Sequence, residues 1–132
     1  MGIAVPNVIS TINNNKKNTF LSDAKRMVST AMYLISSNKS DRDSVLAGTD
    51  KIYTFSKINE KNEYPSDADG GSYNNNTYVK VSYNNSTDEY QYCICVLGSK
   101  RLISRSNTCN PTTATDCLSS TNLTGIDVVK DK

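Results

Sequence analysis

Four cysteines are the side chains of this chain best suited to covalent chemistry. Cys93 and Cys95 lie two residues apart in an alternating segment that predicts a β-strand, so both point to the same face of that strand. A bond between them would pinch the pleat, so each needs a partner elsewhere. Cys109 and Cys117 lie in a polar, irregular region that needs tethering. We therefore expect two structural disulfides from the strand to this region, with the choice between the two such pairings left open.

Zinc is the alternative use of four thiols. A Cys₄ site is chemically feasible, but the Cys93-x-Cys95 spacing is tighter than the two to four intervening residues usual between zinc ligands. Disulfides are favoured because the domain is short, has few apolar residues and has the character of an exported protein. Free buried thiols are the third interpretation.

Two other groups of side chains are candidates for binding ligands. Asp67 and Asp69 have part of the acidic spacing of a calcium-binding loop, but Pro65 falls at its first ligand position and the bidentate glutamate is missing. An exposed turn is the favoured interpretation. Five tyrosines could stack on sugars or bases, although tyrosines at alternate strand positions more often pack across strands. These are Tyr73, Tyr78, Tyr83, Tyr90 and Tyr92.

Enzyme chemistry finds little support in the remaining residues. The chain has no histidine for acid–base work, no glycine-rich phosphate loop and no Gly-x-Ser-x-Gly turn. A cysteine nucleophile without a histidine partner is a poor candidate as well. We therefore expect a protein that is not an enzyme and that needs no cofactor.

Composition limits the size and the partners of the domain. The 132 residues suffice for one domain with a single core, and the hydrophobic fraction of 36% makes that core thin. A net charge of +2 without a basic block gives no reason to expect binding to nucleic acid. No stretch approaches the ~20 apolar residues that a helix needs to span a bilayer.

One long amphipathic helix is predicted to position everything else, from Ile3 to Ile35. Its second half has an apolar stripe at three- and four-residue steps, with lysine, arginine and serine opposite. This stripe covers roughly half of the helical wheel, which suits packing on a sheet. The expected helix–sheet core residues are Phe20, Ala24, Met27, Val28, Ala31, Leu34 and Ile35, with Leu21 beside them.

The first half of this helix has a different apolar face. Val5, Val8, Ile9 and Ile12 centre on a side turned by about 100° from the stripe, so the two halves should meet different partners. Pro6 cannot complete an interior helical hydrogen bond, and the asparagine triplet 13–15 propagates a helix weakly. We therefore expect the residues before about Asn13 to be less protected than Phe20 to Ile35.

The rest of the chain predicts an antiparallel meander. Residues 36–44 are expected to be a connection and 45–48 a short buried turn. Alternation predicts a weak strand at 51–58, a strong loop at 64–72, and three consecutive strands at 77–83, 89–97 and 101–105. The last part has one short strand pattern at 126–129. The predicted fold class is α+β in one domain, divided into 1–37 (helix), 38–76 (loop region), 77–105 (antiparallel sheet) and 106–132 (C-terminal loop region).

Two stretches of the sequence resemble the type IV pilin and pseudopilin family. Gly2-Ile3-Ala4-Val5-Pro6-Asn7, a polar stretch, and then Ser22-Asp23-Ala24-Lys25-Arg26-Met27-Val28-Ser29-Thr30-Ala31 are similar to a pilin helix just after its membrane-buried half. The prepilin cleavage motif, the apolar run and its acidic residue are absent. The chain therefore resembles a soluble head domain from which the membrane segment has been removed, with Met1-Gly2 as a cloning start.

The resemblance implies a structural subunit of a type IV pilus, a surface filament for adhesion or motility. Its partners would be other pilin subunits, and the missing segment would hold it in the membrane before assembly. The residues expected to pack between subunits are Val5, Pro6, Val8, Ile9 and Ile12. The location would be extracellular, on the bacterial surface. Alternatives are a pseudopilin of a type II secretion or DNA-uptake machine and, from another class, a secreted carbohydrate- or host-binding module.

Overall fold

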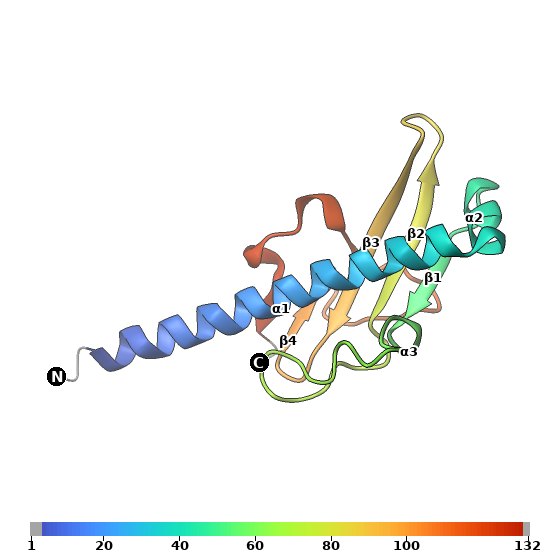
Figure 1. Ribbon diagram of the computed structural model, residues 1–132. Helices are drawn as coiled ribbons and strands as arrows, with labels where there is room; N and C mark the ends of the chain where they lie inside the picture. The colour runs from blue at the N-terminus through green and yellow to red at the C-terminus, as the bar shows by residue number, and fades with distance from the viewer. Residues whose placement is uncertain (1–3, 131–132) are drawn as a thin grey trace.

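One helix and one sheet dominate the protein, as the computed structural model in Figure 1 shows. The structure describes the backbone of residues 4–130 and the side chains of residues 11–129. Helix α1 (Ala4–Ser37) runs the length of the molecule, and its N-terminal turns extend past the rest of the chain. None of the described helices is both long and apolar enough to cross a bilayer. The predicted α+β fold class is confirmed.

The sheet is antiparallel and has the order β1-β2-β3-β4-β6, with β5 paired to β3. Its two longest strands form the predicted hairpin, β2 (Tyr78–Asn84) and β3 (Glu89–Leu97), with Val81 opposite Tyr92. The meander continues into β4 (Arg101–Ile103). The outer strands are β1 (Lys51–Thr54), β5 (Leu118–Ser119) and β6 (Val129–Lys130).

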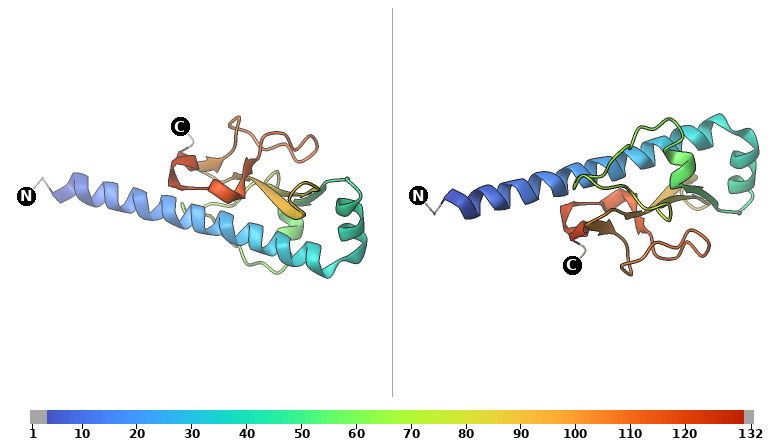
Figure 2. Two further views of the ribbon diagram at one scale, coloured as in Figure 1. Left: turned by 90° about the horizontal axis from the view of Figure 1, so that it is seen from above. Right: turned by 90° about the horizontal axis from the view of Figure 1, so that it is seen from below.

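Alternation along β2 and β3 divides the sheet into two faces with different covers. One face packs on α1, whereas the loop between β4 and β5 covers the side away from that helix, as Figure 2 shows. The helix side buries Phe20, Ala24, Met27, Val28, Ala31 and Ile35 against Val79, Val81, Ile94, Val96 and Ile103. Because side chains in a strand alternate, the intervening residues Tyr78, Cys93 and Cys95 fall on the other face.

The expected connection at 36–44 is wrong, because α1 continues to Ser37 and helix α2 (Lys39–Leu46) follows after one residue. The Asn38 side chain caps this helix by accepting the Asp41 backbone N–H at 3.0 Å. That cap satisfies a backbone donor that would otherwise lack a partner in the first turn. Of the four residues 45–48 expected to form a buried turn, Val45 and Leu46 end the helix, and Val45 alone is buried.

The strand expected at 51–58 is correct only in its first half. Strand β1 ends at Thr54, and the next four residues form the single-turn helix α3 (Phe55–Ile58). In a strand Phe55 and Ile58 would point to opposite faces, whereas three residues apart in a helix they share one side. Both are buried in the core beside α1. Burial of this pair is the physical reason for the change of element.

The C-terminal region is more regular than expected. After β5 it forms two 3₁₀ turns, η1 (Ser120–Asn122) and η2 (Gly125–Asp127), before β6 pairs with β4. The strand pattern at 126–129 therefore covers the end of η2 and only the first residue of β6. Asp127 accepts the Thr124 backbone N–H at 2.7 Å, which closes the turn and leaves Ile126 exposed.

Candidate functional site

The projecting N-terminal part of α1 is the first candidate surface for function. Pro6 falls in the first turn of the helix, where its missing N–H would have no helical partner in any case. The side chains of Val5, Pro6, Val8 and Ile9, four of the predicted subunit-packing residues, lie outside the described residues. The fifth, Ile12, is 48% exposed. The Ile12 side chain is therefore available to a partner.

Arg101 on β4 binds the helix at the base of this projecting part. Its Nη2 donates to Asn13 Oδ1 at 2.7 Å, and its Nε donates to Asp69 Oδ2 at 2.9 Å. The side chains of Arg101 and Asp69 are each only 4% exposed, so this is a buried ion pair. Lys16 Nζ lies 3.9 Å from the other Asp69 oxygen. The helix, the loop and the sheet thus meet in one polar contact.

The loop that carries Asp69 is held in shape by Asp67. Asp67 Oδ1 accepts the backbone N–H groups of Asp69 and Gly71, both at 2.9 Å, and its Oδ2 accepts that of Ser99 at 2.6 Å. Burial acts to raise the pKa of the Asp67 carboxyl, but these donors outweigh burial and lower it. Both acids of the fragmentary calcium motif are therefore engaged by donors of the protein itself. Among the described side chains no group of three or more metal-ligating residues comes together.

Two buried tyrosines connect the head to α1 and α2 by hydrogen bonds. The Tyr73 hydroxyl donates to Asp23 of α1 at 2.6 Å, and the Tyr53 hydroxyl donates to Asp41 of α2 at 2.9 Å. Burial, reinforced by the carboxylate that accepts each hydrogen bond, raises the pKa of both phenols. Tyr73 also packs against Phe20, with ring centroids 5.6 Å apart. These tyrosines are structural ties and expose no sugar-binding face.

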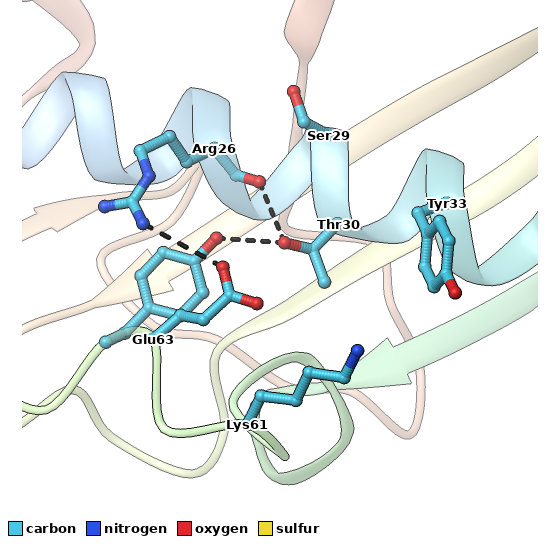
Figure 3. Close-up of a pocket in the computed structure, with 7 residues that line it drawn as sticks. Arg26, Ser29, Thr30, Tyr33, Lys61 and Glu63 are labelled. Carbon is cyan, nitrogen blue, oxygen red and sulfur yellow. Dashed lines mark hydrogen bonds and ion pairs between the residues drawn. The ribbon is translucent and has the colours of Figure 1, made fainter.

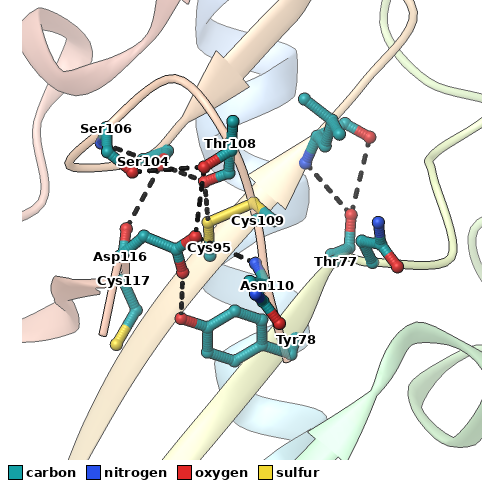
Figure 4. Close-up of a disulfide and its surroundings, with 12 residues drawn as sticks. Thr77, Tyr78, Cys95, Ser104, Ser106, Thr108, Cys109, Asn110, Asp116 and Cys117 are labelled. Carbon is teal, nitrogen blue, oxygen red and sulfur yellow. Dashed lines mark hydrogen bonds between the residues drawn. A yellow bond between two sulfur atoms is a disulfide. The ribbon is translucent and has the colours of Figure 1, made fainter. Parts of the chain in front are cut away.

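On the other face of the sheet the cysteines hold the loop between β4 and β5. Cys93 is bonded to Cys117 and Cys95 to Cys109, so the smaller covalent loop is nested within the larger. Figure 4 shows the inner disulfide over strand β3, close to Tyr78. The expected disulfides are confirmed, the pairing left open by the sequence is settled, and none of the four thiols remains for zinc.

Asp116 organises the backbone next to these disulfides and was not singled out from the sequence. Its carboxylate accepts the Tyr78 hydroxyl at 2.5 Å and the Asn110 backbone N–H at 2.9 Å, as Figure 4 shows. Its own carbonyl accepts the Arg105 N–H at 2.8 Å. Burial, with Asp116 as the second cause, raises the pKa of Tyr78. One acid thus joins the sheet to both ends of the loop.

The predicted helix–sheet core residues lie together on the sheet side of α1. Six of them are buried and Leu34 is half-buried at the edge of the same cluster. The remaining tyrosines of the predicted aromatic set behave as cross-strand packing: Tyr83 lies opposite Tyr90 in the hairpin, with ring centroids 5.7 Å apart. Arg101 and Asp116 were missed because a single buried charge gives no periodic signal in the sequence.

Comparison of the chain with protein-family models, with curated proteins and with solved structures finds no match. The function of the protein is therefore inferred from the arrangement of its residues.

Proposed function

We propose that this chain is a subunit of a type IV pilus-like surface filament, in which helix α1 joins neighbouring copies and the head forms the outer surface. The single observation that supports this most strongly is the division of α1. Its second half is buried on the sheet, whereas its first turns extend free of the head. A helix that served only the core of this domain would begin near Asn13, where Arg101 contacts it.

Assembly is the mechanism in this proposal. The projecting turns of several copies would pack side by side, burying the aliphatic face that includes the exposed Ile12. Before assembly, an apolar segment preceding this chain would hold the subunit in the membrane. The head would then face outward, a location with which its two disulfides are consistent.

The test places a charge on the projecting face in the native, full-length gene. Ile12→Asp should abolish incorporation of the subunit into filaments, because packing would bury an unpaired carboxylate. Asn14→Asp adds the same side chain two residues away, on another side of the helix, and should leave assembly intact. Immunogold electron microscopy of whole cells with an antibody against the head measures both. Equal labelling of filaments in the two variants would contradict the proposal.

The same cells distinguish a pilin from a pseudopilin. A pilin should give long filaments decorated along their length by the antibody. A pseudopilin should give no long filaments at native expression, and Ile12→Asp should instead impair protein secretion or DNA uptake. A chain that appears on the surface unassembled, with Ile12→Asp equal to the native protein in every assay, would refute both.

A further inference from the structure

A groove beside the second half of α1 has the features of a ligand site. It holds about 360 Å³ between the helix and the loop 59–64, a size within the range of small-molecule pockets. Figure 3 shows Tyr33 and Lys61 at one end of it and Arg26 with Glu63 at the other. None of these four side chains contributes to the sheet-facing core, so packing of the core does not explain them.

The floor of the groove is rigid. Tyr64 is buried, its hydroxyl lies 3.0 Å from Thr30 Oγ1, and its backbone N–H donates to Asn59 Oδ1 at 2.8 Å. Thr30 is itself fixed by donating to the Arg26 carbonyl at 3.1 Å. A floor held by hydrogen bonds on both sides cannot collapse into the groove, so a ligand would meet a preformed surface.

The two cationic side chains around the groove differ in how many charged partners they have. Arg26 is fully occupied, since it lies near Asp23 at 3.4 Å and Glu63 at 3.9 Å and covers the Tyr64 ring at 5.1 Å. Among the described side chains Lys61 has no carboxylate partner and lies only over the Tyr33 ring, 5.8 Å from its centroid. The unbalanced charge is therefore the Lys61 ammonium, which favours an anion.

Tyr33 supplies the second part of the recognition. It is 62% exposed, the largest exposure of any aromatic side chain in the described part of the chain. A flat aromatic ring in water offers its face to the C–H side of a sugar ring, and an ammonium beside it fits a carboxylate on that sugar. Glu63, across the groove, can accept hydrogen bonds from sugar hydroxyls.

We propose that this groove binds an acidic saccharide, with a sugar ring on Tyr33, its carboxylate on Lys61 and its hydroxyls toward Glu63. A shallow groove with a sealed floor offers no deep apolar pocket for a peptide anchor, which is why a saccharide fits better than an acidic peptide. The inference does not rest on filament assembly, because all of its residues belong to one head.

The experiment titrates the isotopically labelled chain with a hyaluronan tetrasaccharide, whose only charges are carboxylates, and follows the backbone amides by NMR. Shifts should concentrate in residues 29–33 and 59–64. The same tetrasaccharide with its carboxyls reduced to alcohols should bind at least about tenfold more weakly, as expected for the loss of a charge-assisted contact. Shifts spread over the whole surface, or equal binding of the reduced sugar, would overturn the proposal.

Three variants assign the contacts. Lys61→Ala and Tyr33→Ala should each weaken binding about tenfold, since each removes one of the two principal contacts. Lys100→Ala removes the same charge at an exposed turn between β3 and β4 and should change binding less than about twofold. All three side chains are exposed, so thermal melting should be unchanged. The site is refuted if Lys100→Ala weakens binding as much as Lys61→Ala, or if an acidic peptide binds at these residues and the saccharide does not.

Discussion

The two faces of the sheet are covered by different physical means. On one face α1 buries a continuous set of aliphatic and aromatic side chains, from Phe20 to Ile35, against β2 and β3. On the other face the cover is a loop whose residues are mostly polar, held by two disulfides and by Asp116. The helix face is stabilised by removal of apolar surface from water, whereas the loop face is stabilised by crosslinks that limit the unfolded chain.

This difference shows how a chain with few apolar residues covers both sides of a sheet. The apolar residues available are concentrated on the side where a helix can bury them most completely. The other side uses short-range polar contacts, which need covalent help because a polar loop gains little from burial. The two faces should therefore respond to different perturbations.

The largest expected effect is a charge on the helix face. Met27→Asp buries an unpaired carboxylate at a fully buried position and should lower the free energy of unfolding by more than about 4 kcal/mol, enough to unfold a domain of this size. Met32→Asp is the matched control on the same helix, at a position 44% exposed, and should cost less than about 1 kcal/mol. Circular dichroism during thermal melting measures both. Similar melting temperatures would show that the helix face is not the main core.

Removal of the disulfides should have the next largest effect on stability. The loss of structure should begin in the loop that they hold. Replacing either pair by serines should cost about 3 kcal/mol, with the Cys93–Cys117 pair about 0.5 kcal/mol above the Cys95–Cys109 pair because its loop is longer. Hydrogen exchange should increase in residues 105–117 before it increases in α1 or the β2–β3 hairpin. Simultaneous loss of protection in the loop and in α1 would mean that the two faces unfold as one unit.

Alkaline pH should weaken both faces together, because buried tyrosines lie on each. Tyr73 on the helix face and Tyr78 on the loop face have pKa values raised by burial and by their carboxylate partners. The folded protein therefore keeps these phenols neutral while the unfolded chain ionises them near about pH 10. The contribution of these two tyrosines to the free energy of unfolding is thus fully present below that pH and falls as the pH rises above it.

The measurement for this prediction is the melting temperature between about pH 8 and pH 11.5, a range that spans the ordinary tyrosine pKa. Tyr73→Phe keeps the ring but removes the proton that titrates, so its decline should be less steep than that of the native protein. Tyr33→Phe is the control, because the exposed hydroxyl of Tyr33 makes no buried contact. A Tyr73→Phe curve parallel to the native one would contradict the assignment.

The smallest effect concerns the end of the helix face, where Arg101 holds Asn13. Asn13→Ala removes this contact and should reduce protection of residues 11–16 by about 1 kcal/mol, because the loss of a hydrogen bond to a charged group, about 1.5–3 kcal/mol, is partly offset by the better helix propensity of alanine. Asn14→Ala makes the same substitution at an exposed neighbour and gains the same helix propensity. Hydrogen exchange of the pair isolates the contact. Equal protection in both variants would show that Arg101 does not stabilise the helix there.

The sequence predicted the elements whose side chains repeat regularly. The stripe from Phe20 to Ile35 identified the buried side of α1, and alternation identified the β2–β3 hairpin with both of its cysteines on one face. The short helices α2 and α3 were missed. Helix α2 buries only Val45, so it has no stripe, and the four residues of α3 are too few to show a helical period.

The remaining features depend on how distant segments meet, which no local pattern records. The cysteine pairing follows from the path of the chain between β4 and β5, and that path is fixed by hydrogen bonds to Asp116. Arg101 faces Asn13 although 88 positions separate them in the chain. The reduced protection expected before Asn13 stays a prediction for hydrogen exchange.

The nesting of the two disulfides determines how the chain would respond to mechanical tension. A pull on the two ends of an oxidised subunit reaches Cys93 and Cys117 and passes directly through the bond between them. The segment between those cysteines, including β4 and the loop around Asp116, bears no load and cannot lengthen until that bond breaks. Only α1, the chain up to β3 and the short tail after Cys117 can extend. Under reducing conditions the same pull would draw out the whole chain.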